Sequence, residues 1–150
     1  SMLEQVAENE RLAIEVFAST FERFIPPVSA YAGIMVFGLI PDLGWAEIHD
    51  LLKRIHKWGE RGTIVWVTGF TTQDQAFAYH QANWAPIDNN SIRSPENRAR
   101  TDLEPGQVLE LFDQYSVLHR REDPGPEHRH GDGPLEQHAM FEAVLLREFV

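Results

Sequence analysis

Cysteine is absent from the sequence, and its absence removes several kinds of site at once. A disulfide framework, a thiolate metal site and a cysteine nucleophile all need the thiol group. No apolar run is long enough to cross a membrane, and no basic segment followed by an apolar one marks a secretory leader. We therefore expect a soluble cytoplasmic protein that has no membrane partner.

Positive charge is also scarce. Lys and Arg number 13 against 23 Asp and Glu, which gives a formal net charge of −10. The basic side chains form no stripe with interleaved aromatic residues, and an acidic surface repels phosphate, so nucleic acid is not an expected partner. The chain has 150 residues and is 43% hydrophobic. These values predict one domain, residues 1–150, with a core of ordinary size.

A strand, a helix and a second strand follow one another in the middle of the chain. Ala32–Ile40 is a continuous apolar run, typical of a strand that helices cover on both faces. From Trp45 to Ile55 apolar residues recur at helical spacing, and Gly59 marks the end of this helix. Thr63–Phe70 is apolar and rich in β-branched residues. These patterns predict a parallel βαβ unit with a right-handed crossover.

Elements on either side of this unit follow from similar patterns. Met2–Ala7 has one apolar face and predicts a short helix, and Arg11–Ala18 is a candidate strand. The segment Thr72–Asp74 opens a second helix in the manner of an N-cap. Pro86–Thr101 is polar and irregular, which predicts a long loop, and Pro105 suits the first residue of a further helix.

The last part of the chain contains two more strand candidates, Tyr115–Arg121 and Ala139–Arg147. The segment between them, residues 122–138, is rich in Gly, Pro and His. We predict that the two strands form an antiparallel hairpin at the edge of an α/β sheet.

Six short motifs, taken in order, resemble the class I S-adenosylmethionine-dependent methyltransferases from their third strand onward. They are Met2–Gln5, Phe17–Glu22, Phe37–Leu43, Gly62–Thr68, Leu111–His119 and His128–Gly131. The last motif is similar to a His-Gly loop in small-molecule methyltransferases of the tellurite-resistance kind. The resemblance implies a partial Rossmann-like α/β fold, in which a parallel sheet is closed by the C-terminal hairpin. In the family's numbering its strand order would be fourth, fifth, seventh, sixth.

The same resemblance implies the reaction, which is transfer of a methyl group from S-adenosylmethionine to an oxygen or nitrogen of a small molecule. The family's glycine-rich loop and its ribose-binding acid have no counterpart before Tyr31. If the chain is complete at 150 residues, we do not expect it to bind S-adenosylmethionine with useful affinity. The alternative function is a non-catalytic fragment that associates with another chain.

The missing strands would leave Ala32–Ile40 as a bare apolar edge, and Arg11–Ala18 would have no neighbour. Unpaired edges promote association. We expect a further strand to cover the edge, supplied by a segment outside these residues, by a companion chain or by a second copy in a homo-oligomer.

The resemblance places the cofactor against five residues. Ser19 and Thr20 would border the adenine, while Phe37, Gly38 and Leu39 would lie under the methionine end. Simpler interpretations remain open, because hydroxyl side chains are common in loops and apolar ones at strand ends.

Substrate residues are expected near the end of Thr63–Phe70. Phe70, Tyr79 and Trp84 are aromatic and suit an apolar acceptor, although such residues also pack helices onto sheets. His80 is the candidate general base, because the unperturbed pKa of histidine lies near neutral pH. A purely structural histidine is the alternative.

The 122–138 segment carries His128 and His130, which we assign to the substrate side. Together with Glu136 and His138 they have a composition that suits zinc, iron or manganese. The distance along the chain to Glu136 is too long for the cupin metal motif, so the sequence predicts no metal site. A flexible loop is the alternative to both roles.

Overall fold

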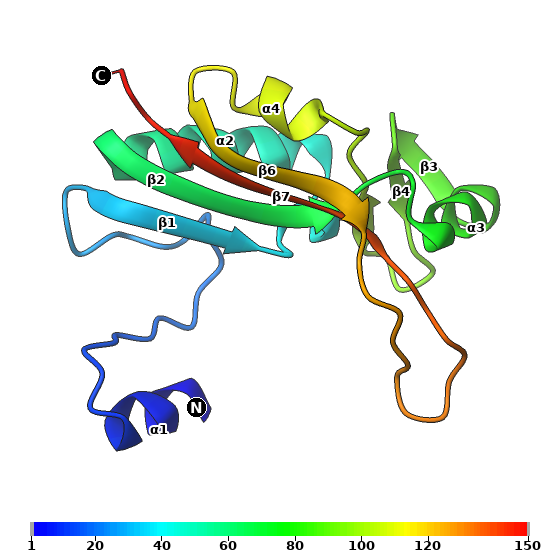
Figure 1. The fold of residues 1–150 in the computed structure, drawn as a ribbon, viewed down its shortest axis with the longest axis horizontal. Coiled ribbons are helices and arrows are strands. Elements are labelled where there is room, and N and C mark those ends of the chain that lie inside the picture. Colours follow the sequence, from blue (N-terminus) through cyan, green and yellow to red (C-terminus); the bar gives the residue numbers. More distant parts are fainter. Residues whose placement is uncertain (1, 150) are drawn as a thin grey trace.

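The computed structural model describes residues 2–149 and contains a central sheet of four strands in the order β1-β2-β7-β6 (Figure 1). Their bounds are β1 Tyr31–Phe37, β2 Gly59–Phe70, β6 Ser116–Pro124 and β7 Ala139–Leu146. β1 and β2 are parallel, and β7 is antiparallel to both β2 and β6. The predicted parallel pairing of β1 with β2, the antiparallel pairing of β6 with β7 and the strand order are confirmed.

One face of the sheet carries the core. Helix α2, Trp45–Trp58, connects β1 to β2 and buries Ile48, Leu51 and Ile55 against the sheet. The short helix α4, Gln107–Leu111, adds Val108 to the same cluster. Figure 1 shows both helices behind the sheet. This apolar contact fixes the sheet as a rigid platform whose strand ends can position a site.

The other face of the sheet is uncovered, which corrects the expectation that helices lie on both faces of β1. Met35 and Phe37 are 68% and 55% exposed. Their cross-strand partners in β2 are Trp66 and Thr68, so these side chains share the uncovered face. No helix among residues 2–149 packs on this face, because α1, Met2–Asn9, stands apart from the sheet (Figure 1).

The predicted strand over Arg11–Ala18 does not form. The segment is coil that follows α1 and joins no sheet. A strand needs a neighbour to satisfy its backbone groups, and the outer edge of β1 pairs with no strand among the described residues. The apolar composition of the segment was therefore a misleading signal.

The predicted loop over Pro86–Thr101 is instead a small antiparallel sheet of β3 Ala85–Asp88, β4 Ser91–Arg93 and β5 Ala99–Thr101. Asn90 and Asn97 stand in the turns with φ of 53° and 65°. Asn tolerates this left-handed conformation better than most residues, so the polar composition specified turns.

Several boundaries differ from the predictions. β1 ends at Phe37, and Ile40–Asp42 forms a 3-10 turn, because Gly38 adopts φ of +62°. β2 begins at Gly59, where α2 ends. Helix α3, Gln75–Asn83, has the expected Asp74 cap, whereas α4 starts two residues after Pro105. Among residues 2–149, no helix has the length and apolar character that a membrane span needs.

Candidate functional site

The carboxyl ends of β1 and β2 meet through one hydrogen bond. The amide of Gly38 donates to Thr68 Oγ1 at 3.1 Å. A side chain at Gly38 would meet open space, but φ of +62° favours glycine there. Phe37, just before it, makes an edge-on contact with Trp66 at 5.1 Å between ring centroids. The turn after β1 is therefore held against the end of β2, with an aromatic pair on the uncovered face.

A hollow of about 650 Å³ lies between β1 and the coil of residues 17–24. Ser19, Thr20, Phe37 and Leu39 all line this edge hollow, and Gly38 lies between two of them in sequence. The predicted cofactor residues are thus brought to one place along the outer edge of β1. The hydroxyl of Ser19 donates to the carbonyl oxygen of Thr20, and both residues are exposed.

Phe70, at the end of β2, lies between charged and aromatic partners. The guanidinium of Arg100 sits 4.8 Å from the Phe70 ring centroid, and the ring of His138 is 5.3 Å away. Arg100 also makes a two-point ion pair with the fully buried carboxylate of Asp102, at 3.1 and 3.2 Å. Burial raises the pKa of Asp102, although Arg100 opposes the shift. This arrangement fixes Phe70 and leaves little freedom at the strand end.

Asp74 joins helix α3 to the hairpin. Its carboxylate caps α3 by accepting from the amide of Ala76 at 2.9 Å. The same side chain accepts from His138 Nδ1 at 2.8 Å and from the amide of Ala139 at 3.1 Å. Because the carboxylate is fully buried, these three hydrogen bonds replace its contact with water.

His80 lies on α3 with its ring stacked on Trp84, 3.9 Å between centroids. Its Nδ1 is buried, and no group among residues 2–149 forms a hydrogen bond with it. Burial lowers the pKa of His80, Arg100 lowers it further, and Asp102 and Asp74 oppose the change. The lowered pKa favours the neutral imidazole, which can accept a proton. Tyr79 contacts His80 but is 64% exposed.

No protein-family model matches the sequence. No curated protein matches it either. Solved structures match its fold: TehB from Haemophilus influenzae has a TM-score of 0.65 at 14% identity, covering 97% of this chain and 45% of that one. A SAM-dependent methyltransferase from Methanosarcina mazei has a TM-score of 0.60 at 12% identity, covering 81% and 61%.

A SAM-dependent methyltransferase from Anabaena variabilis has a TM-score of 0.55 at 14% identity, covering 77% of this chain and 49% of that one. The chain has the class I methyltransferase fold. It spans between 45% and 61% of the length of these three structures. At such low identity the likeness establishes the fold and leaves the reaction to be proposed.

In this methyltransferase fold the substrate residues predicted from the sequence fall into two groups. Tyr79 and His80 lie on α3, and Trp84 caps its C-terminal end beside them. His128 and His130 lie in the extension between β6 and β7, 5.0 Å apart between ring centroids. Phe70 belongs to the second group through its contact with His138.

Sequence reasoning missed Arg100 and Asp102, the ion pair beside Phe70. Arg100 fell inside the predicted loop and Asp102 directly after it, and charged residues in such a polar segment give no signal of burial. A sequence signal did exist, because Asn at turn positions on both sides of a short segment indicates a hairpin. Asp74 was predicted as a helix cap, but its bond to His138 joins positions 64 residues apart.

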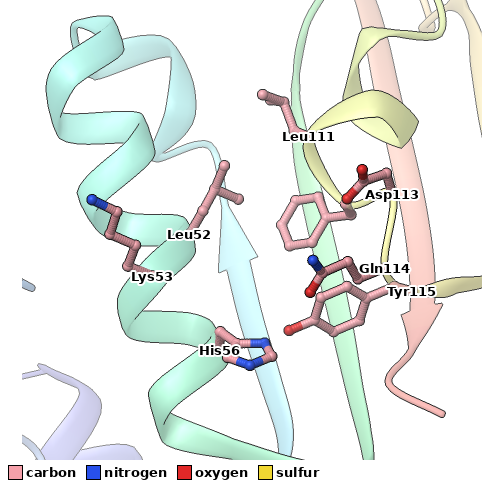
Figure 2. Close-up of a pocket in the computed structure, with 8 residues that line it drawn as sticks. Leu52, Lys53, His56, Leu111, Asp113, Gln114 and Tyr115 are labelled. Atoms are coloured by element: carbon pink, nitrogen blue, oxygen red, sulfur yellow. The ribbon is translucent and has the colours of Figure 1, made fainter. Parts of the chain in front are cut away.

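A smaller hollow of about 310 Å³ lies at the other end of the central sheet (Figure 2). It is formed by the last half of α2 and the turn after α4, and His56 and Tyr115 face each other across it in Figure 2. Burial raises the pKa of Tyr115. This hollow is remote from the carboxyl ends of β1 and β2, and none of the residues predicted for the site lines it.

Proposed function

We propose that this chain is the acceptor-binding half of an S-adenosylmethionine-dependent methyltransferase that methylates an oxygen or nitrogen of a small molecule. The observation that carries the proposal is the sheet order β1-β2-β7-β6, with the edge hollow beside the carboxyl end of β1. In open α/β sheets, ligands bind outside the carboxyl ends of the strands. The fold that this chain shares with known methyltransferases supports the same position for the ligand.

The residues of this chain fit one part of the cofactor. Ser19 and Thr20 offer hydroxyl groups for the adenine side, and Phe37, Gly38 and Leu39 offer an apolar turn for the methionine end. The glycine-rich loop and the ribose-binding acid have no counterpart in the 150 residues. When bound, the cofactor supplies an electrophilic methyl group on a sulfonium centre. The chain's own task is to orient the acceptor and to remove its proton.

His80 is the proposed general base, because its buried Nδ1 is unpartnered among residues 2–149 and its pKa is lowered. Phe70, Tyr79 and Trp84 are proposed to enclose the acceptor, and His128 and His130 to lie near its entrance. Replacing His80 by Gln should lower the methyl-transfer rate by about 100-fold if the acceptor must lose a proton. Binding of S-adenosylhomocysteine should not change.

Calorimetry with S-adenosylhomocysteine tests the proposal on two samples. The first is the isolated 150-residue chain, for which we expect no useful affinity. The second is the protein purified from its natural source in the assembly that it forms there, for which we expect micromolar binding. In that assembly Phe37→Ala should weaken binding, whereas Lys53→Ala, at the remote hollow, should not.

The two failures are distinct. If neither sample binds the cofactor analogue, the methyltransferase function is wrong. If the isolated chain alone binds it at micromolar concentration, the cofactor site is complete without any further strand, and the chain is more than an acceptor-binding half.

The second candidate is a non-catalytic methyltransferase-like fragment that associates with another chain through the open edge. The outer edge of β1 pairs with no strand in the described part of the chain, and this edge and the exposure of Met35 and Phe37 favour it. An assembly that forms through β1 but binds no S-adenosylhomocysteine would select this function over the first.

A further inference from the structure

Four metal-binding side chains converge on the extension between β6 and β7. They are His128, His130, Glu136 and His138, and their ligand atoms all lie within 4.8 Å of one another. The sequence argument against a metal site rested on the long interval before Glu136. That argument was wrong about proximity, because the chain turns back between His130 and Glu136.

Backbone pairing explains the convergence. His128 and Glu136 are bridge partners in an antiparallel arrangement, with amide-to-carbonyl distances of 2.8 and 2.7 Å. This isolated bridge lies outside the regular strands and holds the two segments side by side. The four side chains come together around it, with their ligand atoms within 4.8 Å of one another.

The separations are close to those of a coordinated set. Glu136 Oε2 lies 3.7 Å from His130 Nε2 and 3.8 Å from His138 Nε2. Ligand atoms around a tetrahedral zinc ion, with bonds of about 2.0–2.1 Å, are about 3.3 Å apart. Small rotations of these side chains would bring their ligand atoms to the separations found around a bound zinc ion.

Two of the imidazoles are already oriented as metal ligands. His138 Nδ1 donates to the buried carboxylate of Asp74 at 2.8 Å. His128 Nδ1 lies 3.1 Å from the carbonyl oxygen of Pro126, which can only accept, so this nitrogen carries the proton. In each ring the lone pair is then on Nε2. Metal-binding histidines usually donate their other N–H to a carboxylate or a carbonyl in this way.

Ion pairing alone does not account for the cluster. The His130–Glu136 and His138–Glu136 contacts are longer than hydrogen bonds and remain partly exposed to solvent, and solvent-exposed pairs contribute little to stability. Three protonated imidazoles around one carboxylate would also repel one another. A cation bound by neutral imidazoles removes that repulsion.

We propose that His128, His130, Glu136 and His138 bind one divalent transition-metal ion, with zinc as the best match. Imidazole suits zinc, and three imidazoles with one carboxylate fill a tetrahedral shell. Because His138 is bonded to Asp74, the ion would fasten the extension to the start of α3, beside Phe70. His128 and His130 belong to both proposals, but the metal-binding test does not depend on methyl transfer.

The test uses the untagged 150-residue chain, because a histidine tag would bind metal itself. Metal-free protein is titrated with Zn²⁺ in a competition assay and with Co²⁺ for its visible spectrum. We expect one ion per chain and the absorption bands of tetrahedral Co²⁺. Hydrogen exchange in residues 125–138 should slow when Zn²⁺ is added.

Variants locate the site. His128→Ala combined with His130→Ala should abolish stoichiometric binding, and His49→Ala, an exposed histidine on α2, should have no effect. Asp74→Asn should weaken zinc affinity by about 10- to 100-fold. Unchanged exchange protection of β2 and β7 serves as the folding check for each variant.

Two results would overturn the proposal. One is the absence of stoichiometric zinc binding by the unaltered chain at micromolar concentration, a measurement that does not depend on any variant. The other is binding that survives the double histidine replacement, since the metal would then be held elsewhere.

Discussion

Asp74 Oδ2 accepts a hydrogen bond from His138 Nδ1 at 2.8 Å, between residues 64 positions apart in the chain. The first residue caps helix α3 and the second precedes strand β7. This one contact joins the helix that carries His80 to the extension that carries the histidine cluster. It is the link between the two groups of candidate site residues.

We predict that Asp74→Ala destabilises the fold by about 3 kcal/mol. The loss of a helix cap costs about 1 kcal/mol, and unsatisfied buried partners such as the Ala139 amide cost about 1–3 kcal/mol more. Urea unfolding in the presence of a chelator measures the effect without any contribution from metal. Asp113→Ala, at an exposed position in the turn after α4, is the control. Equal midpoints for the two variants would contradict the proposed role of Asp74.

Gly69 should be intolerant of even a methyl group. A Cβ atom there would lie 2.5 Å from Cε1 and 2.6 Å from Cζ of Phe141, which is 1% exposed. The buried ring or the strand must shift to admit the methyl group, so Gly69→Ala should cost about 1–3 kcal/mol. Gly33→Ala is the matched control in β1, because its nearest contact would be 3.9 Å away. Chemical denaturation of both variants compares them directly, and a neutral Gly69→Ala would show that the two strands can separate locally.

The central sheet could be predicted because its signals are local and strong. The apolar strands β1 and β2 flank an amphipathic helix, and chain order then fixes how they pair. Arg11–Ala18 has similar composition but no partner, and composition alone does not provide one.

The candidate site was predicted less completely, for a related reason. Ser19, Thr20, Phe37 and Leu39 were placed from motifs and do line one hollow. Three other features depend on turns that bring distant segments together. They are the bond between Asp74 and His138, the Arg100–Asp102 ion pair and the grouping of His130 with Glu136. Spacing along a sequence does not reveal such contacts.

The lowered pKa of His80 predicts how stability depends on pH. Burial and Arg100 hold this pKa below 6.5 in the folded chain, so the unfolded chain binds the proton more strongly. Stability must then fall as pH decreases through 6.5 toward the folded-state pKa. His80→Gln removes this dependence, so the wild type should lose stability relative to the variant as pH falls below 6.5.

Urea midpoints at a series of pH values measure that difference, and NMR titration of the His80 ring reports the pKa itself. Asp102 has the opposite effect on stability at lower pH. Its pKa is raised in the folded chain, so the folded chain binds a proton more strongly than the unfolded chain and gains stability as pH falls toward 3.8. A His80 titration midpoint at or above 6.5 would refute the prediction.

The outer edge of β1 should determine how the isolated chain behaves in solution. Its backbone groups face no strand among residues 2–149, and Met35 beside it is 68% exposed on the uncovered sheet face. Unpaired edges next to apolar surface favour strand pairing between molecules, whereas a lysine there opposes it. We therefore predict concentration-dependent self-association that Met35→Lys weakens. Met2→Lys, an 81% exposed position on α1, adds the same charge away from the edge and should leave association unchanged.

Light scattering over a range of concentrations measures the association, and hydrogen exchange identifies the surface that is buried. In a parallel pair the amides of β1 alternate between facing β2 and facing outward, so only the outward set should gain protection as the chain associates. This protection should be lost with Met35→Lys and kept with Met2→Lys. That result would show that β1 pairs with a second copy of the chain when nothing else covers its outer edge. A strictly monomeric chain whose outward β1 amides exchange rapidly at every concentration would show that the edge is tolerated in water, and the case for a further strand beside β1 would then fail.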